Sequence, residues 1–566
     1  MKAINKRLLF SFLLIMSVPV LIAFRLVHLQ VLRHRFYSNR AERQVTGSRS
    51  IPVSRGEIRD RNNRVLAMNV EVNSLAINPR VVVDRRSTAR KLAAHLGMNP
   101  GLLERKLSRE SYFVWLKRRL EDSTAEEIRA LGIEGLDFRK ETKRFYPMGR
   151  MACHLVGAVG LDGGGLSGVE LLCNDVLIRK GISRKFRKDG LCREVDVSAV
   201  NKSDKIDVVL TVDSTLQYIA QKELETIKRN FDPKRAFVII QEPFTGEILT
   251  LACIPEFDQA ADSFKLKKLN NPAVNRVFEP GSVFKIVPAV ALVEEGLCRP
   301  SDLFYCENGK FKLTEGITIH DHEKHGYLTF DGIMAHSSNI GFAKAGIKLG
   351  DSRIYTWTRK FGFGSHTGSR LPGEQRGIVI PPRSRRWNRV TGPIMCYGQG
   401  MAATGIQLVN MFSAVANGGL LMEPKTVKAF VNGENETVWH YKPHVVRRVM
   451  NPESAEIIRK MLTDVVEYGT GRRAGIQGYA VAGKTGTAQK IDPDTRKYSD
   501  ELHIASFGGF IPADDPKLTI LVVVDEPHKT FWASEVACPA FASIAEQAIN
   551  YWNIKENNRK YYASAE

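Results

Sequence analysis

The feature that most constrains this chain is an uncharged apolar run near its N-terminus. The run LLFSFLLIMSVPVLIAF occupies residues 8–24 and reaches the short end of what crosses a bilayer. The following RLVHLQVL can extend the span, because the Arg25 side chain can reach back to the membrane surface. A cleaved signal peptide would need small residues at the end of the run, and only Ala23 is offered there. We therefore expect an uncleaved transmembrane anchor, with the signal peptide as the alternative.

The charges that flank the run predict its orientation. Lys2, Lys6 and Arg7 precede it, and an excess of basic residues favours the cytoplasmic side. The rest of the chain contains no second apolar run of this length. We therefore expect a single-pass protein of the inner membrane, with a cytoplasmic N-terminus and the bulk of the chain in the periplasm.

Length and composition indicate a folded protein of several domains. The 566 residues exceed one ordinary domain, and 43% hydrophobic with 25% charged residues is usual for globular proteins. The net charge of +21 favours anionic partners, but the basic stretches 184–193 and 383–389 are scattered. No zinc-finger spacing or RNA-binding signature is present, so we expect a solvated basic surface and no nucleic acid.

The eight cysteines include no C-x-x-C pair. Cys298 and Cys306 are close in sequence and could form a disulfide in an oxidising compartment. The other interpretation is that the cysteines are packing residues.

Hydrophobic patterns place strands at both ends of the larger part of the chain, with helices between them. Such an order favours an α+β fold, in which helices pack on an antiparallel sheet. The pattern also suggests a domain boundary near residue 206. The predicted strands are 74–83 and 207–213, the helices 87–97, 123–132 and 214–231, the hairpins 236–255 and 505–527, and the loop 161–168.

A possible nucleophile lies in FEPGSVFKIVPAV, residues 278–290. Pro280 and Gly281 end a loop, so Ser282 should begin a helix, where free N–H groups favour developing negative charge. Lys285 lies one turn further on among apolar neighbours, and burial there would favour its neutral amine. A neutral amine beside a hydroxyl can act as its base. The alternative is an exposed lysine on an amphipathic helix.

Two further motifs follow in order along the chain. AHSSNIG contains Ser337, Ser338 and Asn339, and VAGKTGTAQ contains Lys484 and Thr485. Each motif alone is common, but the ordered set S-x-x-K, S-x-N and K-T-G resembles the penicillin-binding and serine β-lactamase superfamily.

The resemblance extends over nearly the whole chain and is strongest to class B penicillin-binding proteins of the septal type. RGEIRDRNNRVLA, residues 55–67, is similar to a motif of the family's pedestal, with Asn63 in place of the usual Gly. Asn63 tolerates the same left-handed turn. FEPGSVFK, with Glu279, is closer to the septal form than to the elongation form. Further matching segments are RFYPMG at 144–149, GLSGVE at 165–170, GQGMAATGIQLVNMFSAVANGG at 398–419 and YGTG at 468–471.

Some positions depart from the family's pattern without touching the three motifs. Arg276 stands where an Asp is common, QEP at Gln241 replaces a more usual D-P, and WASEVACPAF at 532–541 matches only loosely.

The resemblance implies a domain order. Residues 1–35 would be a cytoplasmic tail and transmembrane helix, and 36–206 an elongated pedestal of the dimerisation type. Residues 207–553 would form the penicillin-binding transpeptidase domain, an antiparallel sheet packed by helices, and 554–566 a polar tail.

The resemblance also implies the reaction, which is the cross-linking of peptidoglycan stem peptides during cell division. Ser282 would attack the carbonyl of the penultimate D-alanine, with Lys285 as its base. Ser337 would relay a proton to the leaving D-alanine, and Asn339 would orient Lys285 and the substrate amide. β-Lactams mimic the D-Ala-D-Ala end and should acylate Ser282.

The third motif would bind the substrate. Lys484 would supply positive charge for the terminal carboxylate, and Thr485 a hydroxyl to hold it. Gly486 would permit close approach of the strand edge to the substrate. The backbone N–H groups of Ser282 and Thr487 would form the oxyanion hole. No metal or other cofactor is implied.

The implied partners are a polytopic glycosyltransferase of the SEDS type and other division proteins. A β-lactamase or carboxypeptidase is a second hypothesis, although no E-x-x-L-N motif is present. A third is a scaffold or antibiotic sensor that keeps the fold for binding. IHDHEKH adds His320, Asp321, His322 and His325, which could be zinc ligands, but a polar loop is the expected interpretation.

Overall fold

The computed structural model describes residues 2–50, 55–178, 183–187, 205–261, 269–492 and 494–556. Two compact units are formed, one by Met1–Ser54 with Ile178–Lys205 and the other by Arg55–Leu177 with Ile206–Glu566. Residues 188–193 of the basic stretch 184–193 and most of the predicted polar tail 554–566 lie outside the described residues.

In the first unit, the apolar run lies within one long helix. Helix α1 spans Lys2–Val27 and continues as a π-helical segment, His28–Leu32. Leu8–Leu32 has the length and composition to cross a membrane, with a mean hydropathy of 2.3, and is the one such helix in the described part of the chain. The remaining elements of this unit are α2, His34–Val45, and the antiparallel strands β1, Thr46–Ser50, and β6, Ser183–Arg187.

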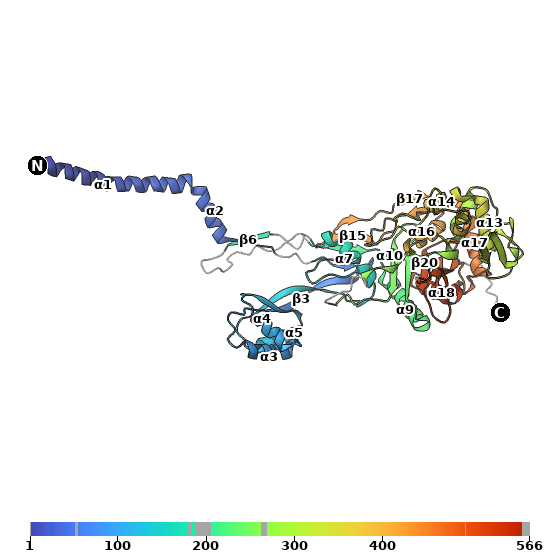
Figure 1. The fold of residues 1–566 in the computed structure, drawn as a ribbon, viewed down its shortest axis with the longest axis horizontal. Helices are drawn as coiled ribbons and strands as arrows, with labels where there is room; N and C mark the ends of the chain where they lie inside the picture. The colour runs from blue at the N-terminus through green and yellow to red at the C-terminus, as the bar shows by residue number, and fades with distance from the viewer. Residues whose placement is uncertain are drawn as a thin grey trace. The chain divides into compact units, whose positions relative to one another are not determined.

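The second unit begins with a lobe built on one long strand, β3, Val65–Ile77 (Figure 1). It pairs antiparallel with β5, Leu136–Phe145, and with β4, Val114–Leu120. Three helices bury a shared apolar core against these strands and are α3, Arg85–Leu96, α4, Pro100–Leu107, and α5, Asp122–Ala130. The two helices predicted in this lobe are thereby confirmed.

The strand predicted at 74–83 is wrong at its C-terminal end, because β3 stops at Ile77. The Asn78 side chain accepts a hydrogen bond from the backbone of Arg80, which starts a turn. Pro79 has no N–H with which to continue the ladder. The turn therefore replaces the strand although the sequence stays apolar.

One sheet joins segments that are far apart in the sequence. Its strand order is β16-β15-β7-β2-β3-β4, with β5 on β3. Strand β2, Ile58–Arg59, pairs in parallel with β7, Ile206–Leu210, which pairs antiparallel with β15, Val427–Asn432. The glycine of the R-G-E-I motif is required here, because a Cβ on Gly56 would lie 1.8 Å from the carbonyl oxygen of Ile206. Strand β16 is Thr437–His440.

A second sheet has five strands, all antiparallel, in the order β18-β19-β20-β8-β9. Both predicted hairpins are confirmed within it, and β18 forms one edge. The bounds are β18, Ala482–Ile491, β19, Tyr498–Ile511, β20, Leu518–Asp525, β8, Arg235–Gln241, and β9, Ile248–Ile254.

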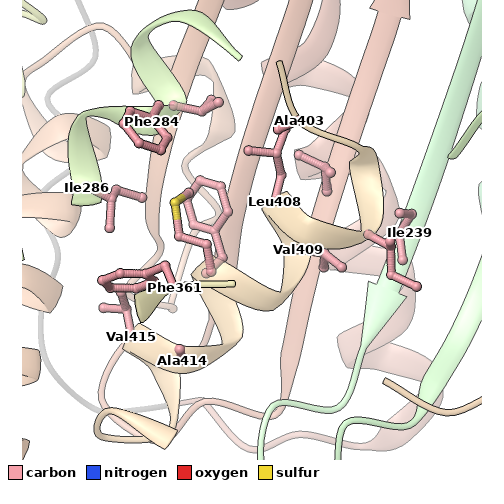
Figure 2. Packing of buried hydrophobic residues seen from close by; sticks show 14 of the residues in the cluster. Ile239, Phe284, Ile286, Phe361, Ala403, Leu408, Val409, Ala414 and Val415 are labelled. Carbon is pink, nitrogen blue, oxygen red and sulfur yellow. The ribbon is translucent and has the colours of Figure 1, made fainter. Parts of the chain in front are cut away.

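Successive side chains along the strands of this sheet point to opposite faces, so the sheet separates two apolar cores. In β8, Val238 and Ile240 face the core that includes helices α9, Ser214–Phe231, and α18, Ala533–Trp552. Ile239 faces the opposite core, where α16, Gly405–Ala416, is buried along its whole length. Figure 2 shows residues of α16 packed among side chains from the Phe284 and Ile286 segment and from Phe361. Helices therefore cover both faces of this sheet. Because all of its strand pairs are antiparallel, the predicted α+β class is confirmed.

The remaining elements are mostly short and surround these two cores. The longer helices are α11, Ile286–Glu294, α13, Asn339–Leu349, α14, Asp351–Lys360, and α17, Pro452–Glu467. The shorter helices are α6, Cys153–Val156, α7, Gly168–Leu172, α8, Asn174–Leu177, α10, Pro272–Asn275, α12, Phe330–Ala335, and α15, Thr391–Met395. The small strands are β10, Leu303–Tyr305, β11, Lys310–Thr314, β12, Ile317–His320, β13, Tyr327–Thr329, β14, Leu420–Met422, and β17, Val445–Arg448.

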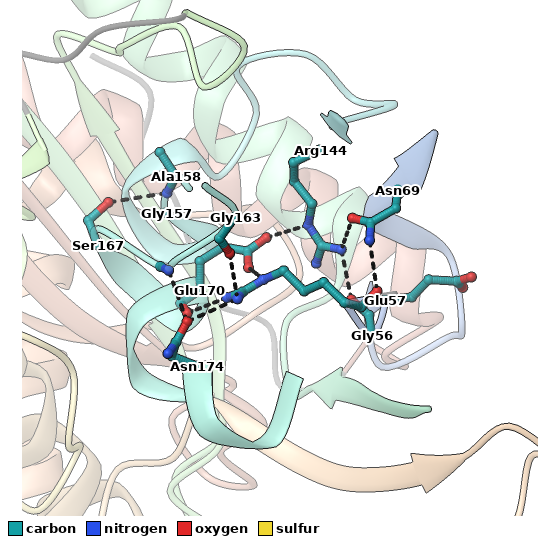
Figure 3. Close-up of polar contacts among 12 residues, drawn as sticks. Gly56, Glu57, Asn69, Arg144, Gly157, Ala158, Gly163, Ser167, Glu170 and Asn174 are labelled. Carbon is teal, nitrogen blue, oxygen red and sulfur yellow. Dashed lines mark hydrogen bonds and ion pairs between the residues drawn. The ribbon is translucent and has the colours of Figure 1, made fainter. Parts of the chain in front are cut away.

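A buried ionic cluster holds three segments of the lobe together, 55–67, 144–149 and 165–170 (Figure 3). The carboxylate of Glu170 accepts from Arg55 Nε at 2.5 Å and from Arg144 Nε at 2.7 Å, and all three side chains are almost fully buried. Arg144 also donates to the carbonyl of Gly56 and to the Asn69 side chain. One buried pair of salt bridges that share Glu170 therefore joins the segments 55–67, 144–149 and 165–170.

Removing the shared carboxylate should destabilise this unit strongly. Glu170→Gln leaves two buried guanidinium groups without their anion, so we expect a loss of about 3–5 kcal/mol in the free energy of unfolding. Glu71→Gln is the matched control, because Glu71 pairs with Lys140 at the surface. The control should cost about 0.5 kcal/mol or less in urea denaturation followed by tryptophan fluorescence. Equal losses in the two variants would contradict the role of the cluster.

Candidate active site

The predicted nucleophile Ser282 lies on a tight turn before a buried helix. A 3₁₀ turn, Gly281–Lys285, leads into α11, where an α-helical start was expected. Pro288 explains the difference, because it has no N–H to donate to the carbonyl of Phe284. Gly281 has φ +58°, and a Cβ there would lie 3.1 Å from that of Ala488 in β18. The Ser282 hydroxyl makes no hydrogen bond to any described residue and so is available to a substrate.

The amine of Lys285 is fully buried and bonded to the S-x-N motif. Its Nζ donates to the carbonyl of Ser337 at 2.6 Å, to the Ser337 hydroxyl at 3.1 Å and to Oδ1 of Asn339 at 2.8 Å. The ring of Phe342 lies 5.6 Å from the amine. The two motifs, distant in sequence, are thus brought into direct contact.

The environment of Lys285 favours its neutral form. Burial lowers its pKa well below that of an exposed lysine, and the positive charge of Lys484 lowers it further. Burial also lowers the pKa of Lys484 itself, to about 7. A neutral amine near Ser282 can accept a proton from the hydroxyl, which a lysine in water at neutral pH cannot do.

The S-x-N turn is shaped by Ser338 and by a residue outside the motif. Ser338 caps α13, accepting from the N–H of Gly341, and donates at 2.5 Å to Asp321. Asp321 also accepts from the N–H of Ile340, and Asn339 donates to the carbonyl of His320. This double contact supports Ser337, whose φ is +58°. The segment that contains Asp321 therefore holds the turn from outside.

The K-T-G motif lies on β18, at the edge of the five-stranded sheet. Lys484 is fully buried and its Nζ lies 3.3 Å from Oγ1 of Thr485. Thr485 shares a hydrogen bond of 2.8 Å with the hydroxyl of Thr470. Thr487 accepts from the backbone N–H of Ala533 at the start of α18. The outer edge of β18 carries no strand partner among the described residues, so it can pair with an extended peptide.

Gly486 lets this strand meet the Ser282 turn. A Cβ at Gly486 would lie 2.6 Å from the Ser506 hydroxyl oxygen on β19, 3.0 Å from Val283 Cγ1 and 3.1 Å from the carbonyl oxygen of Pro280. The missing side chain therefore allows β18 to lie close both to β19 and to the S-x-x-K turn. Any side chain here would push β18 away from the nucleophile.

Sequence reasoning assigned no contacts to three polar residues that lie beside these motifs or bond to them. Asp321 was considered only as a metal ligand, and Thr470 only as part of the matching segment YGTG. Glu279 accepts from the N–H of Gly400 and from the Tyr498 hydroxyl. Burial raises the pKa of Glu279. Thr470 and Glu279 lie in segments that match the family, and this match could have marked them as site residues. Motif spacing could not show which residues they contact.

The two cysteines considered for a disulfide are free and buried. Cys306 Sγ lies 3.4 Å from the Ser338 hydroxyl oxygen, beside the S-x-N turn. The packing interpretation therefore holds for this pair, and the disulfide is not formed.

Comparison with known proteins identifies the family. Residues 236–546 match the model of the penicillin-binding protein transpeptidase domain, and residues 50–164 match that of the penicillin-binding protein dimerisation domain. The chain therefore belongs to the class B penicillin-binding proteins.

Relatives and solved structures match along most of the chain. Stage V sporulation protein D of Bacillus subtilis is 33% identical, over 98% of this chain and 86% of that protein. The probable peptidoglycan D,D-transpeptidase PbpC of Pseudomonas aeruginosa is 32% identical, over 98% and 97%. A penicillin-binding protein 3 of Mycobacterium tuberculosis, solved with ampicillin, has a TM-score of 0.69 at 28% identity, over 90% and 97%. A peptidoglycan synthetase of Bifidobacterium adolescentis has a TM-score of 0.72 at 26% identity, over 91% and 98%.

Replacing the buried amine should remove most reactivity with penicillin. Lys285→Met places an apolar side chain of similar length at this position and removes the base. Covalent labelling should therefore slow by about 10²–10⁴-fold. Lys344→Met is the control, because Lys344 bonds Glu307 and the Tyr305 carbonyl outside the three motifs. Stopped-flow labelling with a fluorescent penicillin measures both rates. A Lys285→Met rate equal to that of the control would contradict the assigned base.

The pH dependence of labelling should report the lowered pKa of Lys285. The fraction of Lys285 in the neutral form increases as pH rises. The labelling rate should therefore increase to a plateau, with a midpoint well below about 10.4, the pKa of a free lysine. Lys484→Met removes the positive neighbour, so the midpoint should move to higher pH. Rates measured from about pH 5 to about pH 10 give both midpoints. A midpoint that moves to lower pH in the variant would overturn this electrostatic account.

Proposed function

We propose that this protein is a serine D,D-transpeptidase that cross-links peptidoglycan stem peptides through an acyl-enzyme at Ser282. The observation that carries the proposal is the contact of the buried Lys285 amine with Ser337 and Asn339, one turn from Ser282. The relative named a probable peptidoglycan D,D-transpeptidase, similar over almost its full length, supports the same reaction.

In the acylation step, Lys285 takes the proton of the Ser282 hydroxyl while its oxygen attacks the carbonyl of the penultimate D-alanine. The tetrahedral oxyanion is held by the backbone N–H groups of Ser282 and Thr487. Removing one such donor usually costs about 3–4 kcal/mol of transition-state stabilisation. The proton then passes by way of Ser337, which bonds Lys285 directly, to the nitrogen of the departing D-alanine.

In the second step, an amine of a neighbouring stem peptide attacks the ester carbon, and the Ser282 oxygen leaves and regains a proton. Asn339 keeps Lys285 oriented through both steps by accepting a hydrogen bond of 2.8 Å. The product is an amide cross-link, and the free enzyme is restored.

Substrate recognition belongs to the edge of β18. The donor peptide would add to this edge as an extra strand, which provides main-chain hydrogen bonds without requiring a particular side chain. The Thr485 hydroxyl and the charge at Lys484 would hold the terminal carboxylate. A bound carboxylate would favour the charged form of Lys484, whose pKa burial lowers to about 7.

Placement at the membrane follows from the helix Leu8–Leu32. We assign it as a single-pass anchor of the inner membrane, with a cytoplasmic N-terminus and a periplasmic catalytic domain. The basic residues Lys2, Lys6 and Arg7 support that orientation. The lobe around β3 is proposed to serve as the family's pedestal. The anchor and pedestal are the proposed contact surfaces for a SEDS-type glycosyltransferase.

The proposed cellular role is septal cross-linking during cell division. This role rests on the likeness of FEPGSVFK to the septal form. In this chain, Glu279 of that segment accepts hydrogen bonds from the backbone N–H of Gly400 and from the Tyr498 hydroxyl. Depletion should give long undivided cells rather than rounded ones, with the protein located at midcell. Rounded cells on depletion would contradict the septal role and leave the reaction itself unaffected.

A fluorescent penicillin should label Ser282 and no other residue. The full-length protein in detergent should form a stable adduct, found by mass spectrometry on the peptide containing Ser282, because the sequence has no E-x-x-L-N motif to activate a deacylating water. Ser282→Ala should lose the label completely, whereas Ser338→Ala should still label Ser282 in any molecules that remain folded. An adduct on another residue, or one that hydrolyses within seconds, would overturn the transpeptidase proposal in favour of another activity.

A further inference from the structure

Beside the S-x-N turn, three side chains outside the proposed chemistry converge on one point. Glu323 and His325 come from the segment between β12 and β13, and His336 from the C-terminal end of α12. One ligand atom from each lies within 4.8 Å of the others, and no other such group of three occurs in the described ranges. We propose that these side chains bind a divalent transition-metal ion, preferentially Zn²⁺, which fastens the 321–325 segment to the catalytic turn.

The donor set matches the chemistry of that ion. Two imidazole nitrogens and one carboxylate oxygen are a common zinc ligand set, with water in the fourth position. Mg²⁺ and Ca²⁺ prefer oxygen ligands and are disfavoured by the two imidazoles. Glu323 is largely exposed, with 67% of its side chain accessible, so an ion can enter from solvent.

One of the nitrogens lacks the partner that a buried polar atom normally has. Nε2 of His325 is inaccessible to solvent and makes no hydrogen bond to any described residue. The closest carboxylate oxygen, Oε2 of Glu323, lies 3.3 Å from it. The rings of His325 and His336 have centroids 4.8 Å apart and are tilted by 46°. A bound ion would satisfy this orphaned nitrogen and explain why two imidazoles and a carboxylate face one another.

The other histidines of the same segment do not join the cluster. The ring of His322 lies 4.2 Å from that of Trp532, and His320 is exposed. Of the four residues considered from the sequence as zinc ligands, only His325 is in the group. Glu323 was passed over within the same motif, and His336 lies in the next one.

The location gives the ion a positioning role. His336 directly precedes Ser337, and the same segment already contacts the turn through Asp321, which bonds Ser338 and Ile340. A metal ion bound by both His325 and His336 would hold the 321–325 segment against the S-x-N turn at a second point. Glu323, His325 and His336 are therefore positioning residues, because they act on Ser337 and Lys285 only through the backbone.

Cobalt titration tests the site independently of any enzyme activity. The full-length protein in detergent is first stripped with a chelator and then titrated with Co²⁺, whose visible absorption reports coordination by nitrogen and oxygen ligands. We expect one Co²⁺ per chain, displaced by Zn²⁺. His336→Gln and Glu323→Gln should each weaken the affinity by about tenfold or more.

His320→Gln is the matched control, since it removes a histidine of the same segment that lies outside the cluster. It should retain the Co²⁺ affinity of the parent protein. Unchanged affinity in His336→Gln, or an equal loss in His320→Gln, would overturn the proposed ligand set. Absence of any one-to-one Co²⁺ binding would overturn the site itself.

The positioning role rests on the proposed function and has its own measurement. Zn²⁺ should speed labelling of the stripped protein by a fluorescent penicillin by about tenfold, because small displacements of reacting groups cost rate steeply. The rate of His336→Gln should not respond to Zn²⁺. Binding of Co²⁺ without a rate response in the parent protein would overturn the positioning role. Loss of all labelling would instead count against the transpeptidase proposal, while the Co²⁺ spectrum would still decide the site.

Discussion

The interaction on which the rest of this structure depends is the buried amine of Lys285. A lysine that is inaccessible to water must find partners for its donors, and here the carbonyl and hydroxyl of Ser337 and Oδ1 of Asn339 supply them. Each of the two turns, S-x-x-K and S-x-N, therefore supplies the hydrogen-bond partners of the other. The same burial lowers the pKa of the amine, so the contact that completes the core also creates the base.

The third motif joins this pair through the backbone. At Gly281 and Gly486 the nucleophile's turn and the edge strand β18 approach so closely that a Cβ at either position would lie 3.0–3.1 Å from atoms of the other segment. Strand β18 lies at the edge of its sheet, and no strand of the described residues pairs with its outer side. The apolar cores on both faces of the sheet hold that edge rigid, since α16 is buried on one side and α9 with α18 on the other. A rigid edge beside an unbonded serine is what peptide acylation needs.

Local patterns predicted much of the architecture correctly. The helix at 214–231 and both hairpins could be recognised because their periodicity and capping residues lie within a few positions of each other. The strand at 74–83 was drawn too far, because the Asn78 turn depends on one side chain. The support of Ser338 by Asp321, the bond between Thr470 and Thr485, and the meeting of His336 with His325 were not predicted. Each joins segments whose distance is set by loops that carry no periodic pattern.

The sequence by itself determined the elements and the chemical groups: an apolar N-terminal helix, an α+β order of strands and helices, and the three motifs in order. These follow from composition and short-range spacing, which act through hydrophobic burial and local hydrogen bonding. Only the tertiary structure decided which groups meet. The sheet that pairs β2 with β7 and β15, and the cluster of Arg55, Arg144 and Glu170, both assemble residues from remote segments. Such contacts form because buried polar groups must be satisfied by whichever partner the packed cores bring within reach.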